Sequence, residues 1–155
     1  MKPSEILENL INNYFNDCKR EDVKSYQIDI FCNEYKIVIE KSNLGFTLTI
    51  FDKENNSRYR FYLDEITAYS MNKKFGLKYV YEQEFKSLKE HLEQIIYEDK
   101  IKDMFENKKI NELNQELNNI GTVEYKMYII RKYARKFGYV FDNSKEELIK
   151  EDDNE

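Results

Sequence analysis

Four successive stretches of alternating apolar and polar residues constrain the fold of this chain more than any other feature. Between residues 26 and 63, apolar side chains recur at every second position, the spacing that places them on one face of a β-strand. Polar segments that suit turns interrupt the alternation at 33–34, 41–44 and 52–57. The pattern predicts a meander of four antiparallel strands with one apolar face.

The register of the three hairpins follows from the same residues. Pairing across each turn places twelve side chains in three rows across the sheet. The predicted rows are Cys32-Tyr35-Ile50-Tyr59, Ile30-Ile37-Leu48-Phe61 and Ile28-Ile39-Phe46-Leu63. A slip of one residue in any hairpin would move its apolar set to the opposite face, so the agreement of three hairpins favours this register.

Helical periodicity flanks the predicted sheet on both sides. An apolar stripe predicts an N-terminal helix that begins at Ser4 as N-cap and ends near residues 19–20. Stripes after residue 79 predict three or four further helices packed on the sheet, so the fold class is α+β. The sequence leaves open whether 79–108 is one helix or two. It also leaves open whether 64–76 is a helix, which we favour, or a fifth strand.

Charge separates a neutral body from an acidic end. Residues 142–155 carry seven acids and two lysines, and their net charge of −5 equals that of the whole chain. We therefore expect a single domain over residues 1–141, followed by a fraying acidic tail with a short helix at 145–149. A body without excess charge does not indicate a nucleic-acid binder.

The two cysteines and the absence of apolar runs bear on location. Cys18 and Cys32 are expected to be reduced, buried hydrophobic residues rather than a disulfide. Residues 1–5 contain no charged-then-apolar leader, and no apolar run approaches the roughly 20 residues of a membrane helix. We expect a cytoplasmic protein that makes no membrane contact, and the composition is typical of bacterial or phage proteins.

The sequence contains no recognisable catalytic set. His91 is the only histidine, and its place on a helix flank predicts a solvated side chain rather than a Cys–His dyad or a metal ligand. Four isolated glycines provide no phosphate-binding loop. Acidic residues abound, but nothing singles out a catalytic pair. We therefore predict neither a metal, nor a cofactor, nor an enzymatic activity.

One basic cluster offers a nucleic-acid alternative. It lies towards the end of the last predicted helix and comprises Arg131, Lys132, Arg135 and Lys136. Basic residues interleaved with aromatic ones can grip a phosphate backbone. Cations also stabilise the C-terminal end of any helix, and we favour that simpler interpretation.

The solvent-side face of the predicted sheet is the best candidate for a binding site. It carries a mixed set of aromatic, aliphatic and basic residues: Phe31, Lys36, Val38, Thr49, Phe51, Arg58, Arg60 and Tyr62. Tyr and Arg around an apolar patch are typical of protein interfaces, unless a helix covers this face. We therefore predict a non-catalytic inhibitor or immunity-type protein that neutralises a toxin or defence enzyme. Self-association, a nucleic-acid-associated regulator and a small-ligand binder or enzyme remain the alternatives.

Overall fold

The computed structural model describes residues 3–43, 45–64 and 76–151, and the chain divides into two compact units. The first unit spans Met1–Glu93 and the second spans Gln94–Glu155. A single helix, α3 (Gly76–Glu106), contributes residues to both units. The α+β class is confirmed. The expectation of a single domain stays a prediction, because compactness alone does not show whether the two units unfold together.

The first unit is built on a five-stranded antiparallel sheet in which each strand pairs with its neighbour in sequence. The strands are β1 (Lys19–Lys24), β2 (Gln27–Cys32), β3 (Tyr35–Ser42), β4 (Gly45–Phe51) and β5 (Ser57–Asp64). Asn33, at the turn between β2 and β3, adopts the left-handed conformation that Asn tolerates in tight turns. The meander was predicted, but with four strands rather than five.

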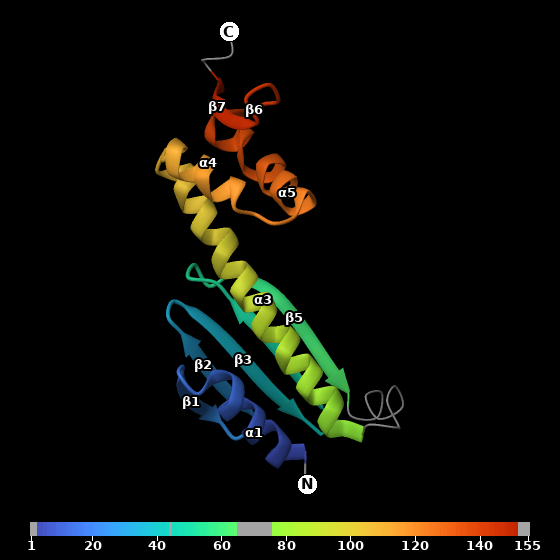
Figure 1. Ribbon diagram of the computed structural model, residues 1–155. Coiled ribbons are helices and arrows are strands. Elements are labelled where there is room, and N and C mark those ends of the chain that lie inside the picture. The colour runs from blue at the N-terminus through green and yellow to red at the C-terminus, as the bar shows by residue number, and fades with distance from the viewer. Residues whose placement is uncertain (1–2, 44, 65–75, 152–155) are drawn as a thin grey trace. The chain divides into compact units, whose positions relative to one another are not determined.

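Helix α1 (Pro3–Phe15) and residues 76–93 of α3 lie on one face of this sheet (Figure 1). The alternating isoleucines of β2, β3 and β4 point to that side and are almost completely buried. Aromatic rings link the layers. The Phe46 ring packs edge-on against Tyr81 of α3 with 4.8 Å between centroids, and the Phe15 and Phe85 centroids lie 6.3 Å apart. We call this the inner face of the sheet.

Two of the three predicted hairpin registers are confirmed. Ile30 pairs with Ile37 between β2 and β3, and Leu48 pairs with Phe61 between β4 and β5. The middle hairpin was wrong by two residues, because Ile37 pairs with Ile50 rather than with Leu48. Strand β3 continues to Ser42, which pairs with Gly45, so the connection is shorter than the predicted loop at 41–44. A shift of two residues keeps every side chain on its predicted face.

Strand β1 was not predicted, and its position corrects two further expectations. Helix α1 ends at Phe15 rather than near residues 19–20, and Lys19 pairs with Phe31. This pairing places Cys18 opposite Cys32, with 5.0 Å between their Cα atoms, and the two form a disulfide. The expectation of reduced cysteines was therefore wrong. Disulfides persist mainly in oxidising compartments, so this bond does not support the cytoplasmic location, which stays a prediction.

A bidentate ion pair also ties β1 to helix α1. The two terminal nitrogens of Arg20 donate to the Glu8 carboxylate at 2.6 and 2.8 Å. The hydrogen bond from Arg20 holds the pKa of Glu8 below its usual value. Strand β1 is otherwise charged and almost wholly exposed, as suits an edge strand that must not recruit another chain. Its apolar contribution is too small to give a sequence signal.

The second unit contains the end of α3 and two shorter helices, α4 (Ile110–Asn118) and α5 (Val123–Tyr133). A 3₁₀ turn, η1 (Arg135–Phe137), leads into a hairpin of β6 (Tyr139–Asp142) and β7 (Glu147–Lys150). The segment 79–108 is one helix as far as Glu106. Buried side chains from every one of these helices and both strands form one core, with Phe105 packed against Tyr133 and Tyr139.

The hairpin replaces the fraying tail and short helix that were predicted for residues 142–150. The Asn114 side chain of α4 clamps the backbone of β7, because its amide nitrogen donates to the Leu148 carbonyl at 3.0 Å and its oxygen accepts the Leu148 N–H at 2.7 Å. Leu148 itself is buried. These two hydrogen bonds fix the position of β7, which the acidic composition of the segment did not indicate.

Two further expectations concern the segment 64–76 and the possibility of a membrane-spanning helix. The question of helix or strand at 64–76 falls almost wholly on residues 65–75, which lie outside the described residues. Across the ranges that the structure describes, no helix combines the length and the apolar character needed to cross a bilayer.

The disulfide should stabilise the first unit. For a separation of 14 residues, the lost loop-closure entropy of the unfolded chain predicts about 3 kcal/mol. We expect Cys18→Ser to lower the free energy of unfolding by about this amount in urea titrations followed by circular dichroism. Reduced wild-type protein is the matched control and should behave like the variant. Equal stability of the oxidised wild type and the variant would contradict the prediction.

Candidate protein-binding surface

The face of the first-unit sheet opposite α1 and α3, here called the outer face, carries the eight residues predicted as a binding site. Strand pairing arranges the face in three rows: Asp29-Val38-Thr49-Arg60, Phe31-Lys36-Phe51 and Gln27-Glu40-Thr47-Tyr62. Arg58 lies at the β-bulge where the pairing of β4 and β5 shifts. The structure therefore brings together all the predicted residues.

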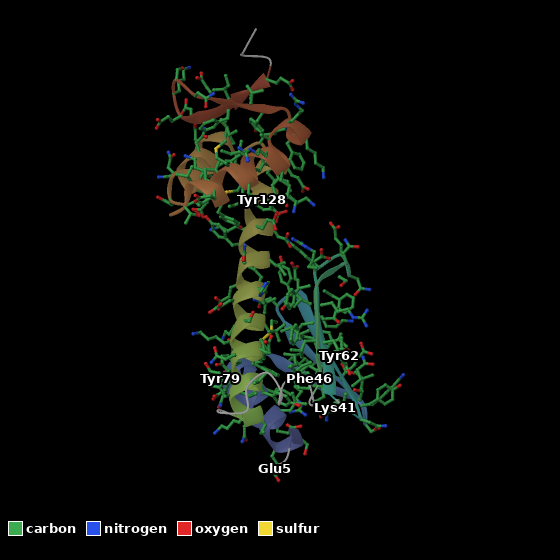
Figure 2. The ribbon with its side chains drawn as sticks, turned by 90° about the vertical axis from the view of Figure 1, so that its right-hand side faces the viewer. Glu5, Lys41, Phe46, Tyr62, Tyr79 and Tyr128 are labelled. Atoms are coloured by element: carbon green, nitrogen blue, oxygen red, sulfur yellow. A yellow bond between two sulfur atoms is a disulfide. The ribbon has the colours of Figure 1, made fainter. Side chains whose placement is uncertain are left out.

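Helices lie on the other side of this sheet within the described part of the first unit. Figure 2 shows Phe46 on the side of α3 and Tyr62 on the opposite side. The possibility raised by the sequence, that a helix covers the outer face, is not realised by α1 or by residues 76–93 of α3. The outer face, which neither α1 nor residues 76–93 of α3 cover, differs from the inner face, where every aliphatic side chain is buried.

Exposure on the outer face rises from its centre towards β5. Val38 of β3 and Thr49 of β4, paired in the middle row, retain only 6% and 5% of their accessible surface. Phe31, on β2, is half-buried, whereas Tyr62 is 53% exposed. The result is a nearly buried centre flanked by the half-buried rings of Phe31 and Phe51 and by an exposed Tyr62 and Arg60 on β5. Large amphipathic side chains beside a desolvated centre are what protein interfaces use as anchors.

Two cationic side chains on this face are held in place. The Lys36 ammonium lies 5.3 Å from the centroid of the Phe51 ring, a cation–π contact. The Arg58 guanidinium donates to the Asp52 carboxylate at 3.2 Å. Burial alone would raise the pKa of Asp52, but hydrogen bonds from the Asn56 and Glu54 amides and from Arg58 outweigh it and lower that pKa.

Several residues of the outer face were missed in the sequence. Asp29 is buried, retaining 8% of its accessible surface, and accepts a hydrogen bond from the Gln27 side-chain amide at 3.0 Å. Glu40 is exposed in the neighbouring row. Their positions alternate in step with Phe31 and Val38, so the same periodicity could have found them. These acids make the face mixed in charge rather than basic.

His91 is less exposed than predicted. Its ring stacks on Tyr59 with 4.2 Å between centroids, and its Nδ1 lies 2.8 Å from the Ser87 carbonyl oxygen. A carbonyl only accepts, so Nδ1 carries the proton, and the neutral ring would keep Nε2 as its acceptor. The histidine is thus half-buried rather than solvated. The cysteines bond to each other, so neither is a free nucleophile for a Cys–His dyad.

The four basic residues of the nucleic-acid alternative have different environments. Arg131 and Lys132 lie in the last turn of α5, whereas Arg135 and Lys136 lie in η1. All four are exposed, but Lys132 forms a 2.8 Å ion pair with Glu98. A lysine committed to an internal carboxylate contributes less to a phosphate-binding patch. The nucleic-acid alternative stays a prediction.

Glu98 organises the polar interior of the second unit. One of its carboxylate oxygens accepts hydrogen bonds from Lys132 at 2.8 Å and from the Tyr133 hydroxyl at 3.0 Å, and Tyr128 lies 3.4 Å away. Burial raises the pKa of Tyr133 to about 12, and the nearby Glu98 charge adds to this effect. Burial alone would lower the pKa of Lys132, but its hydrogen bonds to Glu98 and Tyr128 raise it. Nothing in the sequence singled out Glu98.

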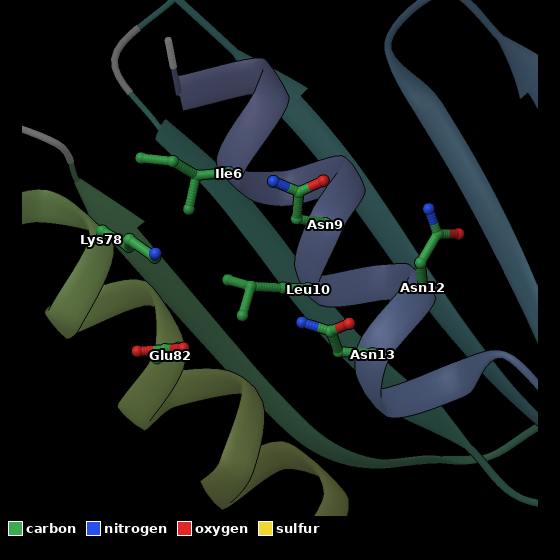
Figure 3. Close-up of a pocket in the computed structure, with 7 residues that line it drawn as sticks. All are labelled: Ile6, Asn9, Leu10, Asn12, Asn13, Lys78 and Glu82. Atoms are coloured by element: carbon green, nitrogen blue, oxygen red, sulfur yellow. The ribbon is translucent and has the colours of Figure 1, made fainter. Parts of the chain in front are cut away.

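A groove of about 340 Å³ between α1 and α3 is a second candidate site (Figure 3). Ile6 and Leu10 form its apolar floor. Its polar lining consists of Asn9, Asn12 and Asn13 from α1 and Lys78 and Glu82 from α3. Amides that both donate and accept, beside one cation and one anion, can orient a small polar molecule. Helical periodicity placed none of these residues together, because they come from helices more than sixty positions apart.

Comparisons with other proteins and a search for metal-binding clusters add no functional assignment. No protein-family model, no curated protein and no solved structure matches the chain. Within residues 3–43, 45–64 and 76–151, no three His, Cys, Asp or Glu side chains are grouped so that they could hold a metal ion.

The second unit should lose stability in alkali through Tyr133. The folded-state pKa of about 12 lies above the ordinary value of 10, so the neutral hydroxyl is favoured in the folded state. Its contribution is complete below pH 10 and is lost as pH rises through 12. We expect Tyr133→Phe to reduce this alkaline loss of stability, measured by urea unfolding at several pH values.

The matched control for this experiment is Tyr26→Phe, because Tyr26 is 48% exposed in the turn between β1 and β2 of the first unit. The control should unfold with the alkaline profile of the wild-type protein. If Tyr133→Phe also follows the wild-type profile, then the Tyr133 hydroxyl does not titrate in the way its position beside Glu98 predicts.

Proposed function

We propose that this chain is a non-catalytic binding protein of the inhibitor or immunity type, and that its outer face docks on a toxin or a defence enzyme. The observation that carries the proposal is an outer face on which Tyr62 and Arg60 are exposed and the Phe31 and Phe51 rings are half-buried, on the side of the sheet away from α1 and from residues 76–93 of α3. The sequence contains no recognisable catalytic motif that competes with this interpretation.

The chemistry of the face favours a protein partner over a nucleic acid. Basic Lys36 and Arg60 lie among acidic Asp29 and Glu40 in adjacent rows. A phosphate backbone would meet repulsion from those carboxylates, whereas a protein surface can oppose each charge with its complement. The half-buried Phe31 and Phe51 rings and the exposed Tyr62 ring offer apolar surface to such a partner.

The rigidity of the face also supports docking. The rows are fixed by strand pairing on both sides of β3 and β4, and the Lys36 and Arg58 side chains have internal partners. Side chains that are held before binding lose less conformational entropy on association. A fixed, mixed surface of this kind is suited to blocking one partner tightly rather than to adapting to many.

The proposal predicts that Tyr62 is a binding hot spot. Immobilised full-length protein should retain a protein partner from lysates of its source cells, and the purified partner should bind Tyr62→Ala about thirtyfold more weakly. The matched control is Tyr26→Ala, because Tyr26 is 48% exposed but lies in the β1–β2 turn. The control should bind like wild type in calorimetric titrations.

Three results would contradict the proposal. The first is the absence of any retained protein, and the second is equal loss of affinity in both variants. The third is a dimer of the chain alone, seen in sedimentation equilibrium and abolished by Tyr62→Ala. That outcome would make the outer face a self-association surface, the alternative that the sequence left open.

The polar groove supports a second candidate function, the binding of a small polar ligand. A panel of amino acids and sugars can be screened by the chemical shifts of Asn side-chain amides. A ligand of the groove should shift the Asn13 amide, and Asn13→Leu should abolish binding. Asn119→Leu, at the exposed end of α4, should bind normally. A panel that shifts neither Asn9 nor Asn13 contradicts this function.

A further inference from the structure

A cavity of about 150 Å³ opens beside the disulfide of the first unit, and both cysteines line its wall. It lies where the end of α1 meets the end of β2, away from the residues that form the outer face. Tyr14, Asn33 and Leu92 contribute further parts of the lining. The volume corresponds to about five water molecules at roughly 30 Å³ each, which is enough for the reactive end of a small thiol compound.

The two cysteine residues differ in exposure. Cys18 is half-buried in the turn after α1, whereas Cys32 retains 8% of its surface at the end of β2. Thiol–disulfide exchange requires a thiolate to reach a sulfur directly, and the sulfur that is attacked is chosen by access. An external thiolate therefore meets Cys18, and Cys32 is the leaving group.

Charged groups around the cavity select the kind of thiol. The Lys89 ammonium in the wall donates to the Tyr14 carbonyl at 3.1 Å, so its position is fixed. The Asp17 carboxylate lies 3.7 Å from the Cys18 sulfur, and Glu93 lines the same cavity. A cation and two anions around a small space complement a molecule that carries both a carboxylate and an ammonium group.

We propose that the Cys18–Cys32 disulfide is a thiol-exchange site that accepts a small zwitterionic thiol of the cysteine type on Cys18. The incoming thiolate attacks Cys18 Sγ, a new S–S bond forms there, and the Cys18–Cys32 bond breaks to leave a Cys32 thiolate that takes up a proton. The thiol supplies the electrons as the reductant. In the reverse direction, Cys32 displaces the bound thiol and restores the internal disulfide.

The test measures how fast each cysteine forms a mixed disulfide in the full-length chain when the other cysteine is replaced by serine. Cys32→Ser leaves Cys18 free to react with cystine, which forms a mixed disulfide and releases one cysteine, and Cys18→Ser is the mirror-image control. We expect mass spectrometry to show modification of Cys18 at least tenfold faster than modification of Cys32, in native buffer. Equal rates for the two variants would overturn the assignment of Cys18 as the accessible sulfur.

Selectivity for a zwitterion is tested with an uncharged disulfide of similar size. In the Cys32→Ser background, Lys89→Met should slow the reaction with cystine about fivefold, the size of one screened ion pair, and should leave the reaction with hydroxyethyl disulfide unchanged. Equal slowing of both reagents, or of neither, would overturn the role of Lys89.

The wild-type protein provides a readout that does not depend on variant folding. Its disulfide should be opened by L-cysteine much faster than the chain unfolds globally, as followed by alkylation of released thiols. Reduction only at the rate of global unfolding would overturn the proposal, because the cavity would then give no access to the bond.

Discussion

Burial of one face of a twisted sheet is the constraint on which the rest of the first unit depends. Ile30, Ile37, Ile39 and Ile50 are fully buried beneath α1 and α3. Since side chains alternate along a strand, fixing these residues on the inner face also fixes every intervening residue on the outer face. The candidate interface therefore follows from the core, because the strand residues that do not pack into the core lie together on the outer face.

The same alternation explains which features of the fold could be predicted and which could not. It identified four strands and the face of each residue, and it tolerated a two-residue error between β3 and β4 because that error preserves the face. It could not reveal β1, whose charged residues bury almost nothing. Without β1, nothing placed Cys18 opposite Cys32, so the disulfide was missed for the same physical reason.

The candidate site was predictable in its composition but not in its surroundings. The periodicity assembled Phe31, Lys36 and Tyr62 on one surface, but it does not show where the helices pack. Contacts between elements distant in sequence, such as Glu98 with Lys132 and Tyr133 or Asn114 with Leu148, have no local pattern. Each is a polar pairing that satisfies a buried group, and only the tertiary arrangement shows it.

The outer face and the cavity beside the disulfide have distinct chemistry. The outer face combines aromatic and charged side chains held in rows, and it is suited to recognition. The cavity beside the disulfide combines the half-buried Cys18 with the fixed Lys89 ammonium group, and it is the site proposed for exchange with a small thiol. The groove between α1 and α3 is polar and separate from both, so the three surfaces can be altered independently by substitutions that leave the isoleucine core intact.

Hydroxyl-radical footprinting of the free, full-length chain tests the central claim most directly, because it measures side-chain exposure in solution. The account predicts that Tyr62 is oxidised at a rate similar to that of Tyr26, and that Tyr81, buried on the inner face, is protected. Protection of Tyr62 to the level of Tyr81 would contradict the account, because another part of the chain would then cover the outer face.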